Sequence, residues 1–187
     1  MANVELLDKV MKFIEHNEHA WNQNSWARVV QNGFSYDEMR DFIAEDPQNP
    51  LCGTQRCFAG HTVAFEGWLP LFEPGDRTTY DCQNKAGDKA DIGVKARELL
   101  GIDNYTADLL FAGANDLEDL RAQVEYIKEH GHLTRDWDHK DIQCPDCEGT
   151  GQVEDSCFEC GHSTTVQCNK CDGSGEITVD RDGDQVY

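Results

Sequence analysis

The chain has 187 residues, and its 16 Lys and Arg face 36 Asp and Glu, so the formal net charge at pH 7 is −20. Hydrophobic residues make up 39% and charged residues 28% of the chain, which excludes a fibrous or fully disordered protein and leaves enough apolar surface for one modest core. The acidic charge argues against direct binding to nucleic acid or anionic lipid, because such binding depends on Lys and Arg. It favours basic proteins, or protein sites that normally hold nucleic acid, as partners.

No stretch of the chain approaches 18 consecutive apolar residues, so the sequence predicts no membrane-spanning helix. The opening residues MANVELLDKV contain acidic side chains where a secretory signal would carry a basic flank and an apolar run. We therefore expect a soluble protein of the cytoplasm, where thiols stay reduced.

The first 130 residues carry apolar side chains at helical spacing. The first group of apolar residues at this spacing predicts an amphipathic helix over residues 3–18. The capping-box pattern Ser-Tyr-Asp-Glu predicts the start of a short helix over residues 35–45. A third helix is expected over residues 54–68.

A stretch rich in Pro and Gly at residues 69–88 interrupts this pattern and predicts a loop. Two shorter helices are expected after it, one over residues 92–100 and one around residues 109–111. The last helix of this half is the clearest. Asn115 caps it, acidic residues favour its positive N-terminus, and basic residues occupy its last turn before Gly131.

These patterns predict a mainly α N-terminal domain over residues 1–130 and a linker at 131–143. A small cysteine-rich module at 144–179 and an acidic tail at 180–187 follow. The module has few large aliphatic residues and cannot fold on hydrophobic burial alone. We expect bound metal to hold it together as a zinc-stabilised β-hairpin unit.

Nine cysteines are the second constraint, and six of them form three CxxC pairs between residues 144 and 171. In a reducing compartment such pairs are metal ligands rather than disulfides, and zinc is the default metal. Two pairs belong to copies of one pattern, CxxCxGxG, with Cys144 and Cys147 in the first copy and Cys168 and Cys171 in the second. The glycines permit the positive φ at which the chain leaves each cysteine knuckle. We expect the four thiolates to complete one tetrahedral zinc site with a structural role.

The two copies resemble the repeat of the DnaJ-type cysteine-rich zinc domain, over residues 144–177. That family pairs its outer knuckles on one zinc and its inner knuckles on another, and its hairpin module contacts unfolded or client polypeptides. The resemblance implies that the four cysteines form an outer site and that the module binds protein. The chain departs from the family in having three pairs in place of four. It also contains no His-Pro-Asp tripeptide, so the J-domain that stimulates the partner ATPase is absent.

The middle pair, Cys157 and Cys160, lacks the GxG tail and is followed by His162. These three residues are candidate ligands of a second zinc, with Asp155, His139 or water as the fourth ligand. In a competing arrangement Cys157 and Cys160 share the zinc with one outer pair and leave the other pair free. The spacing alone does not choose between the two arrangements.

The stretch Cys52-Gly-Thr-Gln-Arg-Cys57-Phe-Ala-Gly-His61 allows three interpretations. On a helix Cys57 and His61 share one face, and with Cys52 and Cys82 they have the residue types of a zinc site. The interpretation we favour is that buried cysteines pack the start of a helix and that His61 is a buried, hydrogen-bonded group. The third is a thiol enzyme in which His61 activates Cys57, although no residue for an oxyanion hole is evident.

Three further features lie in residues 20–130: a tryptophan-rich start, a CGTxxCxAG[H/W] helix and a late LF…N.LEDL helix. In this chain they correspond to Trp21, Gln23, Trp26, Cys52, Gly53, Thr54, Cys57, Ala59, Gly60, His61, Leu110, Phe111 and the run from Asn115 to Leu120. They resemble small proteins of actinobacteria and their phages, some of which are called DnaJ-like for their CxxCxGxG tail. The resemblance implies a phage or prophage origin and brings no established activity with it.

We expect a non-enzymatic zinc-binding adaptor or chaperone-like protein that binds a host or viral polypeptide. Its contact surface would be the apolar and backbone edges of the module around Phe158, Val166 and Ile177. The alternative is an acidic inhibitor that occupies the nucleic-acid-binding site of a host enzyme, which the net charge favours. The thiol enzyme that uses Cys57 and His61 is the third hypothesis.

Overall fold

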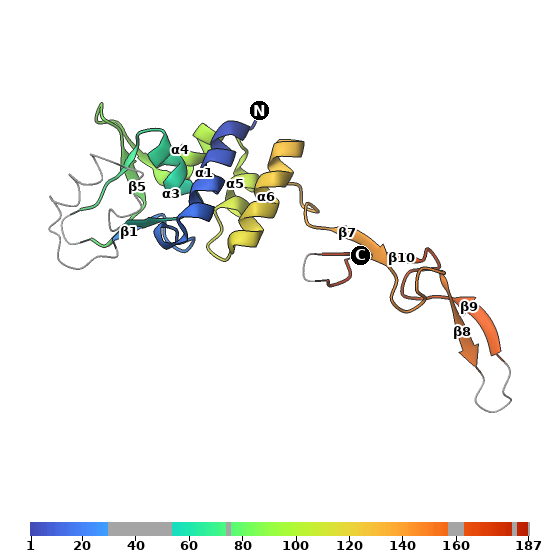
Figure 1. The fold of residues 1–187 in the computed structure, drawn as a ribbon. Helices are drawn as coiled ribbons and strands as arrows, with labels where there is room; N and C mark the ends of the chain where they lie inside the picture. The colour runs from blue at the N-terminus through green and yellow to red at the C-terminus, as the bar shows by residue number, and fades with distance from the viewer. Residues whose placement is uncertain (30–53, 74–75, 157–162, 181–182, 187) are drawn as a thin grey trace. The chain divides into compact units, whose positions relative to one another are not determined.

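The structure, a computed structural model, describes residues 1–29, 54–73, 76–156, 163–180 and 183–186. The chain divides into two compact units, Met1–Thr134 and Arg135–Tyr187. The described residues contain five α-helices and ten short strands (Figure 1). The fold is therefore mixed α+β, and the prediction of a mainly α N-terminal domain is wrong.

The helices of the first unit pack around one apolar core (Figure 1). Their bounds are α1 Val4–His16, α3 Phe58–Phe65, α4 Ile92–Leu100, α5 Asn104–Leu110 and α6 Leu117–His130, and a 3-10 helix, η1, spans Glu18–Ala20. α1 contacts α3, α4 and α6, and α3 also contacts α4. All five α-helices contribute fully buried side chains, among them Leu7, Phe58, Ile92, Leu110 and Leu120.

Two three-stranded antiparallel sheets complete the first unit, in the orders β2-β1-β4 and β3-β5-β6. The strands are β1 Ala27–Val29, β2 Thr54–Arg56, β3 Leu69–Pro70, β4 Thr78–Thr79, β5 Asp81–Gln83 and β6 Lys89–Asp91. The expected helix over 54–68 therefore begins only at Phe58, because the residues before it pair with β1. The expected loop over 69–88 contains three of these strands. Each strand is too short to show the alternation that marks a strand in sequence.

The short helix expected around residues 109–111 is α5, which begins earlier, at Asn104, where the Asp103 carboxylate accepts a hydrogen bond from the Thr106 N–H. Two other helix ends lie close to their expected positions. α4 ends at Gly101, which adopts the left-handed conformation with φ 64°. α6 is capped by Asp116, one residue after the expected Asn115: the Asp116 carboxylate accepts a hydrogen bond from the Asp119 N–H, and the Asp119 carboxylate accepts one from the Asp116 N–H. The helix expected over residues 35–45 lies outside the described residues.

The second unit contains two two-stranded antiparallel sheets (Figure 1). In the first, β7 (Lys140–Gln143) pairs with β10 (Glu176–Val179), and in the second, β8 (Gln152–Ser156) pairs with β9 (Ser163–Gln167). β7 thus lies in the stretch expected to be a linker. Among the described residues, every helix of the chain is too short or too polar to span a bilayer.

Candidate metal centre

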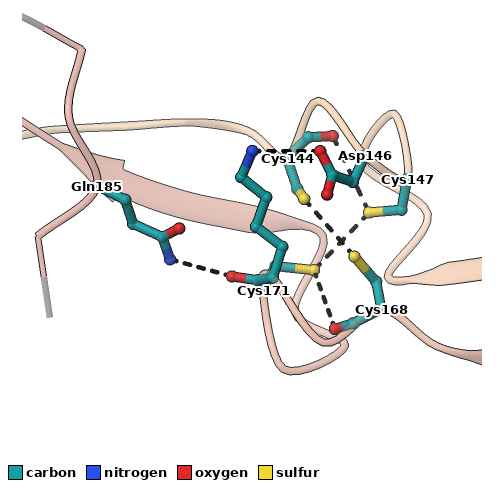
Figure 2. Close-up of polar contacts among 7 residues, drawn as sticks. Cys144, Asp146, Cys147, Cys168, Cys171 and Gln185 are labelled. Carbon is teal, nitrogen blue, oxygen red and sulfur yellow. Dashed lines mark hydrogen bonds and ion pairs between the residues drawn. The ribbon is translucent and has the colours of Figure 1, made fainter.

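The four cysteines of the two CxxCxGxG copies meet at one point between the sheets (Figure 2). Cys144 and Cys147 follow β7, whereas Cys168 and Cys171 follow β9. The Sγ atoms of Cys144 and Cys168 are 3.8 Å apart, those of Cys147 and Cys171 are 3.7 Å apart, and all four sulfurs lie within 4.8 Å of one another. All four residues are buried and none forms a disulfide. The set can hold a metal ion, and it is the one such group of His, Cys, Asp and Glu side chains found among the described residues.

Backbone N–H groups turn toward the sulfurs in both knuckles. The Gly151 N–H donates to Cys147 Sγ at 3.3 Å, and the Gly175 N–H donates to Cys171 Sγ at 3.4 Å. Both glycines have positive φ, at 73° and 82°. A Cβ on Gly151 would overlap a backbone carbonyl oxygen of the opposite knuckle. The GxG ending therefore supplies both the turn and the donors that stabilise negative sulfur.

A two-fold internal repeat relates the knuckles, with an offset of 24 residues. The Cys168 N–H donates to the Gly151 carbonyl at 2.9 Å, and its counterpart, the Cys144 N–H, donates to the Gly175 carbonyl at 2.8 Å. Each knuckle is thus closed by a hydrogen bond to the last glycine of the other. The repeat also relates β7 to β9 and β8 to β10.

The repeat contains two functional positions that the sequence analysis missed. Thr150 and Ser174 occupy the same place between the glycines, and each hydroxyl donates to the carbonyl of the preceding cysteine, at 2.6 Å and 2.7 Å. Both hydroxyls also contact the carbonyl two residues further on. The signal that would have found them is a hydroxyl residue at the variable position between the two glycines of both copies.

One ion pair also joins the two copies. Lys170 Nζ lies 3.2 Å from Asp146 Oδ1, and these residues hold equivalent positions inside the two CxxC pairs (Figure 2). Their side chains are 38% and 55% exposed, so the pair contributes about 1 kcal/mol or less. Its effect is to orient the knuckles rather than to hold them together.

The thiols differ in how readily they ionise. Burial acts to raise the pKa of Cys171, but the Gly175 N–H and the neighbouring thiols outweigh burial and lower that pKa to about 7. At Cys168 burial prevails and raises the pKa to about 11. One thiol of the set therefore ionises near neutral pH, and a cation among the sulfurs would favour ionisation of the others.

A small apolar cluster surrounds the sulfurs. Ile177 and Val179 of β10 are 6% and 1% exposed, and Ile142 and Val153 pack against the same cluster. Ile177 was expected on a contact surface, and this expectation is wrong because the residue faces the cysteines. Val166, in contrast, is 39% exposed.

The other candidate ligands of the module are placed as follows. Cys157, Cys160 and His162 lie outside the described residues, as does Phe158. Asp155 is exposed on β8, and His139 Nε2 lies 3.9 Å from the carboxylate of Asp138.

In the first unit, Cys57 and His61 are buried and each has a backbone partner. Cys57 Sγ lies 3.9 Å from the Trp26 carbonyl, and His61 Nε2 lies 3.2 Å from the Ala20 carbonyl. Burial raises the pKa of the Cys57 thiol to about 11. Burial, with the Arg56 charge, lowers the pKa of His61 to about 3. A neutral thiol and a neutral imidazole at pH 7 are the opposite of an activated pair.

The remaining cysteines do not complete a metal site around Cys57. Cys82 lies in β5, its thiol donates to the Ala90 carbonyl at 3.4 Å, and burial together with Asp91 and Asp81 raises its pKa to about 11. Cys52 lies outside the described residues. Within the described part of the chain, the geometry agrees with the packing interpretation of this stretch.

Comparison of the chain with protein-family models, with curated proteins and with solved structures finds no match.

Proposed function

We propose that the four-cysteine cluster holds one Zn²⁺. Thiolates are soft ligands that suit zinc, and a tetrahedral Zn²⁺ with Zn–S bonds of about 2.3 Å places neighbouring sulfurs about 3.8 Å apart. The pairs Cys144 with Cys168 and Cys147 with Cys171 are already at 3.8 Å and 3.7 Å. These two sulfur–sulfur distances therefore match the spacing expected around this ion, and all four sulfurs lie within 4.8 Å of one another.

The role of this zinc is structural. Four protein ligands leave no coordination position for a substrate or a water molecule. The apolar cluster of the second unit is small and contains the cysteines themselves, so metal coordination supplies much of its folding free energy. The zinc holds the two sheets in a fixed relation to the knuckles.

We propose that the zinc-bound module acts as an adaptor or chaperone-like unit that binds a host or viral polypeptide. The observation that carries this proposal is the sheet of β8 and β9. All described side chains of β9 are exposed, including Val166, and the sheet has only two strands, so each strand has an outer edge. Unpaired strand edges offer backbone donors and acceptors to an extended chain.

A hollow of about 300 Å³ beside this sheet adds to the case. It is lined by Thr165, Val166 and Gln167 of β9, by Gln152 of β8 and by residues 150–151 and 172–173 of the knuckles. Its walls are mainly hydroxyl, amide and backbone groups with the Asp172 carboxylate and Val166, which suit a polypeptide better than an apolar ligand. The resemblance to phage proteins supports a phage origin for this adaptor.

The direct test is binding of an unfolded polypeptide to the zinc-loaded full chain. We would label reduced, carbamidomethylated lysozyme, which is basic, and α-lactalbumin treated in the same way, which is acidic, and follow fluorescence anisotropy. The matched control is the double variant Cys144→Ser with Cys171→Ser, which removes the zinc site. Binding of the basic chain by the native protein and loss of binding in the variant are expected.

The acidic-inhibitor hypothesis predicts a different result. The net charge of −20 would then direct the protein to the nucleic-acid site of an enzyme. In that case the double cysteine variant would bind such an enzyme as well as the native protein does, and duplex DNA would displace both. Binding that requires the zinc module and resists DNA would contradict the inhibitor hypothesis.

A further inference from the structure

The C-terminal residues pair with the end of one of the two sheets through a single antiparallel bridge. Val179 of β10 and Gln185 form an antiparallel bridge. The Val186 N–H donates to the Thr178 carbonyl at 3.0 Å, and the Asp180 N–H donates to the Asp184 carbonyl at 2.9 Å. Residues 184–186 therefore cover the C-terminal end of the outer edge of β10.

The side chain of Gln185 secures this segment. Its amide donates to the Lys170 carbonyl at 3.0 Å, beside the second knuckle (Figure 2). Val179, under the segment, is 1% exposed. The tail thus shows how an extended chain can add to a strand of this module.

The internal repeat places β8 in the position that β10 holds in the other copy. The 24-residue offset relates Thr178 to Glu154 and Val179 to Asp155. β8 pairs with β9 along one edge. Along its other edge, no described segment pairs with it. The chain therefore contains one such edge covered by its own tail and an equivalent edge without a described partner.

The two edges differ in one decisive side chain. In a bridge of this kind the facing residues lie at a non-hydrogen-bonded site, where the Cα atoms are about 4.5 Å apart and the side chains share one face. On β10 the residue at this site is the buried Val179, whereas on β8 it is the exposed Asp155. Glu154 is also exposed, and neither carboxylate takes part in an ion pair among the described residues.

We propose that an extended, basic polypeptide segment adds antiparallel to the outer edge of β8, with a Lys or Arg opposite Asp155. The N–H of the next residue of the segment donates to the Glu154 carbonyl, in the same way as the Val186 N–H donates to the Thr178 carbonyl. The chain's own acidic C-terminus, DRDGDQVY, is a poor occupant, because it would bring like charges to Glu154 and Asp155. This inference rests on the proposed polypeptide-binding function and adds its site and the chemistry of its ligand.

The test uses the zinc-loaded full chain and a fluorescent nine-residue peptide of alternating lysine and valine. Asp155→Lys is expected to weaken binding by about tenfold or more, because a like charge then faces the peptide lysine. The control is Glu176→Lys, which makes the same charge change on β10 and is expected to alter binding by about twofold or less. Zinc content and circular dichroism of each variant establish that it is folded.

N-methylated peptides test the strand pairing itself. With lysine opposite Asp155, the lysine N–H groups point away from β8 and the valine N–H groups point toward it. N-methylation of the valines is therefore expected to abolish binding, whereas N-methylation of the lysines is expected to preserve it. A charge-matched pair of peptides thus separates backbone pairing from simple attraction between charges.

Each contrary outcome has a distinct meaning. If Asp155→Lys and Glu176→Lys weaken binding equally, or if both methylated peptides bind, the β8 site is wrong while polypeptide binding stands. If neither the peptide nor an unfolded chain binds, the proposed function fails as well. If the protein without peptide forms dimers that Asp155→Lys disrupts, the occupant is a second copy of this chain and the basic ligand is wrong.

Discussion

The Cys168 N–H donates to the Gly151 carbonyl, and this bond joins the beginning of the second knuckle to the end of the first. The equivalent bond runs from the Cys144 N–H to the Gly175 carbonyl. Neither knuckle is therefore complete without the other. We infer that metal binding and folding of residues 135–187 form a single event.

The first prediction concerns the ligand set. Cys171→Ser is expected to remove one equivalent of zinc. The variant has only three thiolate ligands, and the one it lacks is the thiol that ionises near neutral pH. Cys82→Ser, at a buried thiol of β5 outside the cluster, is the control and is expected to keep its zinc. Metal analysis of the purified proteins gives the readout. Equal zinc in both variants would contradict the four-cysteine site.

The second prediction separates the two arrangements of the middle pair. If Cys144, Cys147, Cys168 and Cys171 bind one metal together, Cys157→Ser with Cys160→Ser leaves that site intact. Cobalt substitution reports this directly, since the absorption of tetrahedral Co²⁺ depends on the number of thiolate ligands. The absorption bands of the four-thiolate cluster are expected to be the same in the double variant as in the native protein. A shift of those bands in the double variant would mean that the middle pair shares the metal with an outer pair.

The third prediction tests the close approach of the two knuckles. Gly151→Ala is expected to weaken zinc binding by about tenfold or more, because the new methyl group would overlap the Gly173 carbonyl. Gly183→Ala is the matched control, since Gly183 also has positive φ, at 87°, but no atom of the described residues lies within 4 Å of its Cβ position. Both variants have the cost of a left-handed alanine, about 1 to 2 kcal/mol. A competition titration against a chromophoric chelator measures the difference, and equal affinities would exclude a steric role for Gly151.

The metal centre was accessible from sequence because its geometry is local. A CxxCxGxG copy places two sulfurs and their backbone donors within eight residues, so each pair could be recognised as a candidate ligand pair from sequence, whereas the spacing left open which pairs share one metal. The cap of α4 at Gly101 is local in the same way. The turn of each knuckle and the end of α4 thus have causes within one short segment, whereas the meeting of the two knuckles depends on contacts across 24 residues.

The strands of the first unit were missed because their causes are distant in sequence. β1 is three residues long and pairs with β2 and β4, which begin at Thr54 and Thr78. Ile177 was placed on the surface for a similar reason, because an apolar residue in a short strand does not reveal which face is covered. The C-terminal residues 184–186 have no strand pattern in sequence, and only their pairing with β10 reveals that they are extended.

The last prediction follows from the buried imidazole of His61. Burial and the Arg56 charge lower its pKa to about 3, whereas an unfolded chain has a histidine pKa near 6.5. Below pH 6.5 the unfolded state therefore binds a proton that the folded state does not. The free energy of unfolding decreases as the pH is lowered. This linkage predicts that the free energy of unfolding decreases by about 2 kcal/mol from pH 7 to pH 5.

His61→Gln retains a donor for the Ala20 carbonyl and removes the titration, so its unfolding free energy is expected to depend less on pH over this interval. Urea unfolding of both proteins at the two pH values, followed by tryptophan fluorescence, measures the difference, because all other groups titrate alike in the pair. Identical pH dependence would show that the His61 imidazole is not held neutral in the core.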